Sequence, residues 1–173
     1  MDQAAIIERL KRIPLFQGIR EDESRLLALA GIVSSRSCSA GDAVITEGHE
    51  GDELFILNQG KVNILKRTLD DDVYTIVSLS DEEDVFFGEL ALLDEELRSA
   101  SVTAETDCEF LVINRADFHR LGEEDPRLGL LVTRAIGRAL SRKLRKTNED
   151  LITLFEALVG EVAEGGNLEE SWE

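Results

Sequence analysis

Two residues of opposite charge, Glu89 and Arg98, are the best candidates in the sequence for binding a small ligand. Gly88 lets the backbone approach a ligand closely, and the short helical turn expected after it has free amides that can face an anion. An arginine can grip two phosphate oxygens at once, whereas a lysine acts as a point charge. A carboxylate accepts a hydrogen bond from a hydroxyl group. The small Ser99 and Ala100 leave room for backbone donors, so these residue types are chemically suited to a ligand that carries phosphate and hydroxyl groups.

The sequence lacks the motifs of several common enzyme classes. The two histidines, His49 and His119, are expected in a turn and in a helix, which does not provide the histidine cluster of a metal-dependent barrel enzyme. The sequence contains neither a Gly-x-Ser-x-Gly elbow nor a Walker loop. We therefore predict that the protein is not an enzyme, with no catalytic residue, no metal site and no cofactor.

Charge and hydropathy limit the partners. The 36 acidic and 19 basic residues give a net charge of -17, which repels nucleic acid. Seven basic residues lie in residues 127–148, where there is no acidic residue. Three interpretations of this stretch are open: a solvated face, an electrostatic match to the acidic remainder, or a docking surface for an acidic partner or a second anion. We favour the match. No apolar run reaches the roughly 20 residues of a membrane span, and no secretory signal is recognisable. We expect a cytoplasmic protein that binds neither nucleic acid nor membrane, with Cys38 and Cys108 as structural thiols.

The hydrophobic pattern predicts an α+β fold. A short amphipathic helix ending before Pro14 and a second helix at residues 21–32 open the chain. Short β-rich runs separated by turn signals follow as far as Ile113, and they favour an antiparallel sandwich or barrel closed by hairpins. A helical period then returns, with Asp125 as the expected N-cap of a long helix and Pro126 in its first turn.

The long C-terminal helix carries a seam with alternating steps of three and four residues, which is typical of a coiled coil. The seam consists of Leu130, Thr133, Gly137, Leu140, Leu144, Thr147, Leu151, Leu154 and Leu158. It predicts a homodimer; the alternative is a helix buried in its own domain. We divide the chain into a ligand-binding domain at residues 1–146, a helix extension at 147–160 and an acidic flexible tail at 161–173.

Three segments in collinear order carry a resemblance to a known family. They are residues 14–19 (PLFQGI), residues 47–57 (EGHEGDELFIL) and residues 87–102 (FGELALLDEELRSASV), the last of which we call the cassette. Together they resemble the cyclic nucleotide-binding domain family, which includes catabolite activator protein and the regulatory subunits of cyclic-AMP-dependent kinase. The likeness covers about residues 10–145 and implies an antiparallel β-barrel of the double-stranded β-helix or jelly-roll type, with N-terminal helices and a long C-terminal helix.

The resemblance implies that cyclic AMP or cyclic GMP binds in the cassette. Glu89 would take the ribose hydroxyl, Arg98 the phosphate, and Ser99 would border phosphate and base. The implied binding residues are Gly88, Glu89, Leu90, Ala91, Arg98, Ser99 and Ala100. The long helix would supply a lid over the purine: local sequence favours Thr147 and Asn148, whereas counting from the proline favours Lys143.

We expect a bacterial stand-alone regulatory domain in which the ligand repositions the long helix and so changes a homodimer or a protein partner. The alternative is a scaffold protein with a cassette that does not bind, in which Glu89 and Arg98 form a structural ion pair. A transcription regulator is the least favoured function. A helix-turn-helix module needs about 60 residues, and 26 residues follow Thr147.

Overall fold

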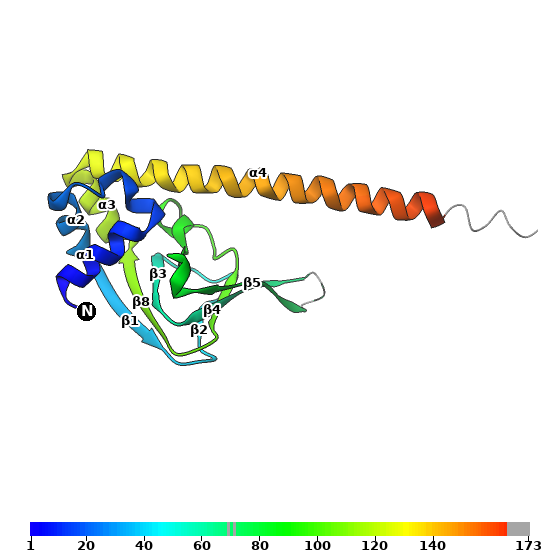
Figure 1. Cartoon of the computed structure of the whole chain (residues 1–173), viewed down its shortest axis with the longest axis horizontal. Coiled ribbons are helices and arrows are strands. Elements are labelled where there is room, and N and C mark those ends of the chain that lie inside the picture. Colours follow the sequence, from blue (N-terminus) through cyan, green and yellow to red (C-terminus); the bar gives the residue numbers. More distant parts are fainter. Residues whose placement is uncertain (69, 71, 166–173) are drawn as a thin grey trace, which may run out of the picture. The chain divides into compact units, whose positions relative to one another are not determined.

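The computed structural model describes residues 1–68, 70 and 72–165, with side chains as far as residue 160. The chain divides into two compact units, Met1–Ala135 and Ile136–Glu173. The helices are α1 (Gln3–Arg12), η1 (Pro14–Ile19), α2 (Glu23–Ala30), η2 (Asp81–Glu83), η3 (Glu89–Leu92), α3 (Arg115–Glu124) and α4 (Pro126–Gly165). The strands are β1 (Val33–Cys38), β2 (Ala43–Ile45), β3 (Glu53–Gln59), β4 (Lys61–Arg67), β5 (Val73–Ser80), β6 (Phe86–Phe87), β7 (Ser101–Ala104) and β8 (Cys108–Asn114). Figure 1 shows them coloured along the chain.

The strands form two four-stranded antiparallel sheets, with the orders β1-β8-β3-β6 and β2-β7-β4-β5. Strands that are distant in sequence therefore lie side by side, as β1 does with β8. The predicted jelly-roll arrangement, with N-terminal helices and a long C-terminal helix, is confirmed (Figure 1). Its strands lie in two sheets that do not close into one barrel.

The core between the sheets explains the continuous apolar runs in β3 and β8. Successive side chains of a strand point to opposite faces, and one set from these strands joins the core cluster, while Leu54, Ile56, Leu111 and Ile113 are buried on the other face. At the centre, Phe55 stacks on Phe87 with ring centroids 5.6 Å apart, and Phe110 meets both rings edge to face. Because Phe87 opens the cassette, the aromatic core fixes where the cassette begins.

The N-terminal helices begin at aspartates. Asp2 accepts a hydrogen bond from the Ala5 amide at the start of α1, and Asp22 accepts one from the Arg25 amide at the start of α2. Such caps satisfy backbone donors that the helix itself leaves unpaired. The helix expected at residues 21–32 is α2, which is shorter at both ends.

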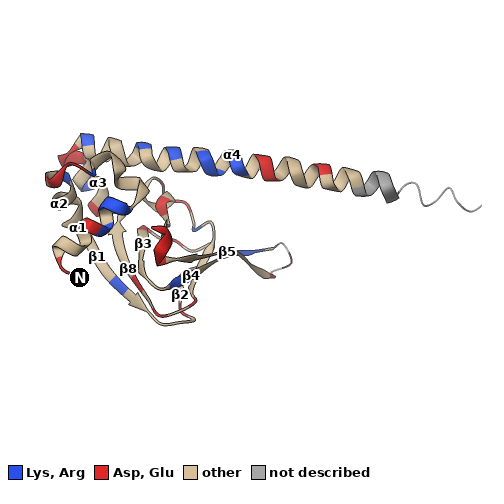
Figure 2. Cartoon of the chain, viewed as in Figure 1, with Lys and Arg blue, Asp and Glu red and all other residues tan. Residues whose placement is uncertain are grey.

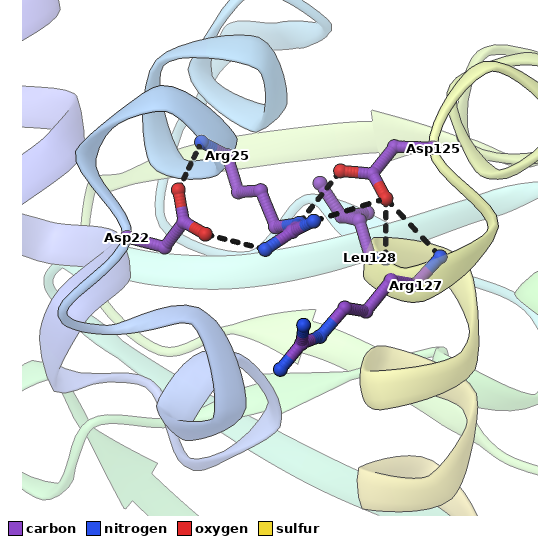
Figure 3. A network of polar contacts seen from close by, with 5 residues as sticks. All are labelled: Asp22, Arg25, Asp125, Arg127 and Leu128. Carbon is purple, nitrogen blue, oxygen red and sulfur yellow. Dashed lines mark hydrogen bonds and ion pairs between the residues drawn. The ribbon is translucent and has the colours of Figure 1, made fainter.

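The start of α4 is held by the predicted cap. One Asp125 carboxylate oxygen accepts hydrogen bonds from the amides of Arg127 and Leu128, each at 3.1 Å. The other carboxylate oxygen accepts one from Nε of Arg25 at 2.6 Å, and Arg25 also pairs with Asp22 (Figure 3). One arginine of α2 thus links the beginnings of two helices. The expectation that Asp125 is the N-cap is confirmed.

The second unit contains the C-terminal part of α4, which is helical as far as Gly165. The helix runs beyond residue 160, where the predicted extension ends, and residues 166–173 of the predicted tail lie outside the described residues. Basic residues recur along this helix before its acidic residues begin at Glu149 (Figure 2). Several apolar side chains on it are exposed: Leu144, Leu151, Ile152, Leu154, Phe155, Leu158 and Val159. Across the described residues, no helix is both long and apolar enough to cross a membrane.

Candidate functional site

The two ends of the cassette meet at the guanidinium group of Arg98. Its Nη2 donates a hydrogen bond to the carbonyl oxygen of Glu53 at 2.9 Å, and its Nη1 donates a long one to the carbonyl of Gly88 at 3.5 Å. The backbone is held as well, because the Arg98 amide donates to the carbonyl of His49 and the Gly48 amide donates to the carbonyl of Arg98, both at 2.9 Å. Backbone groups of the segment at residues 47–57 therefore hold Arg98 in position.

Two glycines make room for the Arg98 side chain. A β-carbon at Gly51 would lie 2.2 Å from its Nε, and one at Gly88 would lie 2.9 Å from its Nη1. Gly88 also has φ +75°, in the left-handed region that glycine adopts without strain. Gly51 and Gly88, one from each motif, thus make room for one arginine.

The charge of Arg98 is only partly compensated. Burial is the main cause that lowers the pKa of Arg98, and the nearby Arg115 lowers it further, whereas the charges of Glu53, Asp52 and Glu89 raise it. Within the described part of the chain, no carboxylate makes an ion pair with Arg98; its guanidinium partners are backbone carbonyls. A half-buried cation with neutral partners is a ready site for an anion.

Glu89 begins η3 directly after Gly88 and is half-buried. Among residues 1–68, 70 and 72–165, its carboxylate has no hydrogen bond and no ion pair, so the alternative of a Glu89–Arg98 ion pair is not formed. Leu90 is also half-buried, and Ala91 is buried beneath the turn. The turn therefore leaves this carboxylate without a partner among the described residues, and its role toward a ligand hydroxyl stays a prediction.

The other end of the cassette is fixed by an ion pair. Lys66 of β4 pairs with Glu47, and its Nζ also donates to the carbonyl of Ser99 at 2.7 Å. Ser101 accepts a hydrogen bond from the Glu47 amide at 2.9 Å. Ser99 is exposed and the adjacent Ala100 is half-buried. Two predicted residues at this end are thus anchored, Arg98 to the 47–57 segment and Ser99 to β4.

The predicted lid residues lie in the second unit. Lys143, Thr147 and Asn148 are exposed on α4. Their role over a purine stays a prediction, and so does the choice between the two registers.

The acidic run before the cassette has structural partners that sequence reasoning missed. Asp84 adopts a left-handed conformation with φ +53° and accepts a hydrogen bond from Nη1 of Arg9 at 2.5 Å. Arg12 approaches the same carboxylate oxygen at 2.9 Å. Arg9 is 7% exposed and donates in addition to the carbonyl of Leu57 at 2.6 Å. Two arginines of α1 therefore neutralise Asp84 immediately before β6 and the cassette.

The histidines are dispersed, as the sequence indicates. His49 lies in the turn before β3, and Nε2 of His119 on α3 lies 2.9 Å from the carbonyl oxygen of Leu92. Among the described residues there is no group of three or more His, Cys, Asp or Glu side chains able to hold a metal ion.

Comparison with known proteins covers this same region. The family described as "Cyclic nucleotide-binding domain" matches residues 35–125. These residues include the 47–57 segment and the whole cassette, which together form the surroundings of Arg98 described above.

Two curated relatives match most of the chain. The "CRP-like cAMP-activated global transcriptional regulator" of Mycobacterium tuberculosis is 32% identical over 159 residues, which are 90% of this chain and 66% of the relative. The "Cyclic AMP receptor protein" of Thermus thermophilus is 34% identical over 155 residues, which are 89% of this chain and 68% of the relative. The chain thus spans about two thirds of the length of these relatives.

A solved structure of a kinase regulatory subunit has the same fold. It is the regulatory subunit of a cAMP-independent protein kinase A from Trypanosoma brucei, with a TM-score of 0.67 and 26% sequence identity. The match covers 79% of this chain and 46% of that chain. The fold therefore occurs in proteins named for transcription and in proteins named for kinase regulation.

Proposed function

The chain belongs to the cyclic nucleotide-binding domain family, and from this membership we propose that it is a cytoplasmic signalling protein that binds cyclic AMP or cyclic GMP in the cassette. The ligand's phosphate pairs with Arg98, and its ribose hydroxyl donates a hydrogen bond to Glu89. The protein is a regulator and not an enzyme.

The observation that carries the proposal is the environment of Arg98. Its guanidinium group is held between Gly51 and Gly88 and hydrogen-bonded to backbone carbonyls, with no carboxylate in ion-pair contact among the described residues. Paired structural arginines have a carboxylate partner, as Arg36 has in Glu53. A ligand phosphate supplies the missing anion with two oxygens, which matches the fork of donors on arginine.

Glu89 complements this site from the other end of the cassette. Glu89 is the first residue of the helical turn that follows Gly88, and its carboxylate has no partner among the described residues. The carbonyl oxygen of Gly88 accepts a long hydrogen bond from Arg98. A monoanionic cyclic phosphate with an adjacent hydroxyl satisfies both residues at once. A simple phosphate ion satisfies Arg98 alone, so Glu89 provides selectivity for the nucleotide.

Isothermal titration calorimetry with cyclic AMP and cyclic GMP tests the proposal. We expect saturable binding of at least one of them, and a loss of at least about 100-fold in affinity in Arg98→Ala, because two charge-assisted hydrogen bonds are lost. Glu89→Gln should weaken the cyclic nucleotide but leave the weak binding of inorganic phosphate unchanged.

The matched control is Arg120→Ala, which removes the same side chain from an exposed pair with Asp117 on α3. It should bind like the unmodified protein. Absence of heat with both nucleotides, or equal affinity in Arg98→Ala, would contradict the proposal and support the scaffold alternative.

The output we propose is a change in the position of α4 that alters a homodimer or the docking of a protein partner. A ligand can shift such an equilibrium only by binding the two arrangements with different affinity. The exposed apolar side chains on the second unit support pairing with a second copy.

A further inference from the structure

A pair of cysteines lies opposite each other in the first sheet, away from the cassette. Cys38, the last residue of β1, is the register partner of Cys108, the first residue of β8. Directly opposed residues in an antiparallel pair have Cα atoms about 4.5 or 5.5 Å apart. A disulfide spans Cα separations of about 4.4–6.8 Å. The backbone therefore already has the spacing of a disulfide, although both residues are free thiols.

The two thiol groups also interact. Burial and the neighbouring Cys108, by its charge and by a side-chain hydrogen bond, raise the pKa of Cys38. The Cys108 thiol has further hydrogen-bond contacts with the carbonyl oxygens of Lys61 at 3.2 Å and Thr106 at 3.3 Å. The two thiol groups are thus neighbours, and the hydrogen bonds that they make are weak.

The pair is open to solution on one side. Both cysteines line a surface hollow of about 410 Å³ together with Ser37, Ser39, Asp42, Gln59, Asp107 and Glu109. Cys38 is half-buried, whereas Cys108 is 2% exposed. A small reagent can therefore reach Cys38 first. The described residues include no third ligand that would make the pair a metal site.

We propose that Cys38 and Cys108 form a reversible intramolecular disulfide by exchange with a low-molecular-weight disulfide. The Cys38 thiolate attacks one sulfur of the reagent, a mixed disulfide forms on Cys38, and one reagent thiolate leaves and takes up a proton. Cys108 then loses its proton to water and attacks the Cys38 sulfur, which releases the second reagent thiolate. Two protein thiols are oxidised and the reagent disulfide is reduced to two thiols.

The environment of the pair sets the rate. The thiolate is the attacking species, and the raised pKa of Cys38, to which Asp42 and Asp107 contribute, keeps it scarce near neutrality. At pH values below that pKa, each increase of one pH unit should therefore make oxidation about tenfold faster. The bridge would link the end of the edge strand β1 covalently to β8, its neighbour in the sheet.

The test incubates the folded full chain with excess oxidised glutathione at mildly alkaline pH, followed by acid quenching, thiol titration in urea and intact-mass measurement. We expect both thiols to disappear, the mass to fall by two hydrogen atoms, and dithiothreitol to restore both. In Cys108→Ser the mixed disulfide has no resolving thiol, so one glutathione should remain on Cys38. In Cys38→Ser the buried Cys108 should stay unmodified.

Four results would overturn the proposal: two unchanged thiols, stable glutathione adducts on the unmodified protein, covalent dimers on a non-reducing gel, or a two-hydrogen loss accompanied by loss of the circular dichroism of the folded chain. The last result would mean that the bridge forms only after unfolding.

Discussion

A β-carbon on Gly51 would lie only 2.2 Å from the Nε atom of Arg98. Gly51 has no hydrogen-bonding side chain and does not touch a ligand in the chemistry proposed above. It nevertheless decides whether Arg98 can occupy its place over the carbonyl of Glu53. The glycine and the arginine are 47 positions apart in sequence, and they form one structural unit.

Gly51→Ala should therefore lower nucleotide affinity without unfolding the domain. The end of a flexible arginine can move, so we expect a change in unfolding free energy of at most about 1 kcal/mol, but an affinity loss of at least tenfold, since a charged hydrogen bond contributes about 1.5–3 kcal/mol. Calorimetry and urea denaturation measure the two effects. Gly160→Ala is the control, because an added β-carbon there meets nothing; equal affinity in the two variants would refute the role of Gly51.

Asp84→Asn tests the contact between α1 and the segment before the cassette. Asparagine keeps the shape and tolerates the left-handed backbone, but it leaves the buried Arg9 without a carboxylate. We expect a loss of about 3 kcal/mol in unfolding free energy, measured by urea denaturation. Asp117→Asn, which breaks an exposed pair with Arg120, should change stability by less than about 1 kcal/mol. Similar losses in both variants would show that burial of Arg9 has no special effect.

The contact between Arg25 and Asp125 predicts a pH dependence. The hydrogen bond from Arg25 is the main cause that lowers the pKa of Asp125, and the Leu128 amide contributes next. The folded protein therefore binds fewer protons at this site than the unfolded chain as the pH falls below about 4, so the stabilisation is present above that pH and is lost below it. The thermal midpoint of Arg25→Ala should lie below that of the unmodified protein at pH 7, and the gap should narrow on acidification. A gap that is constant with pH would contradict this linkage; Arg20→Ala, on an exposed pair, is the control.

The apolar face of the second unit predicts self-association. Leu154 is 61% exposed on α4, and burial of a leucine contributes about 2 kcal/mol. Leu154→Glu should shift sedimentation equilibrium toward the monomer, whereas Thr153→Glu, at an exposed position on the face away from the seam, should not. A monomeric unmodified protein would rule out the proposed homodimer.

The lid assignment makes a separate prediction about purine preference. If Thr147 and Asn148 cover the base, alanine at either position should reduce affinity about fivefold, as expected for one neutral hydrogen bond, and should change the ratio of cyclic AMP to cyclic GMP binding. Lys143→Ala should leave that ratio unchanged. The opposite pattern in competition calorimetry would select the other register.

Local patterns in the sequence predict the fold and the ends of the cassette well. The Asp125 cap, the short strands and the turn after Gly88 each depend on residues close together in sequence, and so their spacing is informative. The family resemblance adds the jelly-roll arrangement, which periodicity alone leaves as one of several sandwich and barrel architectures.

Contacts between distant segments could not be predicted in this way. Arg9 belongs to an amphipathic helix whose charged residues are expected in solvent, and its partner Asp84 is 75 positions away. No spacing rule connects them, because the pairing depends on how α1 packs against the end of β3. Gly51 is similar: its motif marks a turn, but the need for a glycine comes from Arg98, in another motif.

The pairing of β1 with β8 affects how the chain acquires its structure during synthesis. Val33 faces Ile113, so β1 leaves the ribosome long before its partner exists, by roughly 4–16 s at ordinary elongation rates. During that interval β1 lacks its partner strand, and the first sheet is completed only after β8 has been synthesised. Folding that relies on such non-local contacts is slow, so completion of the first sheet is expected late in the folding of this chain.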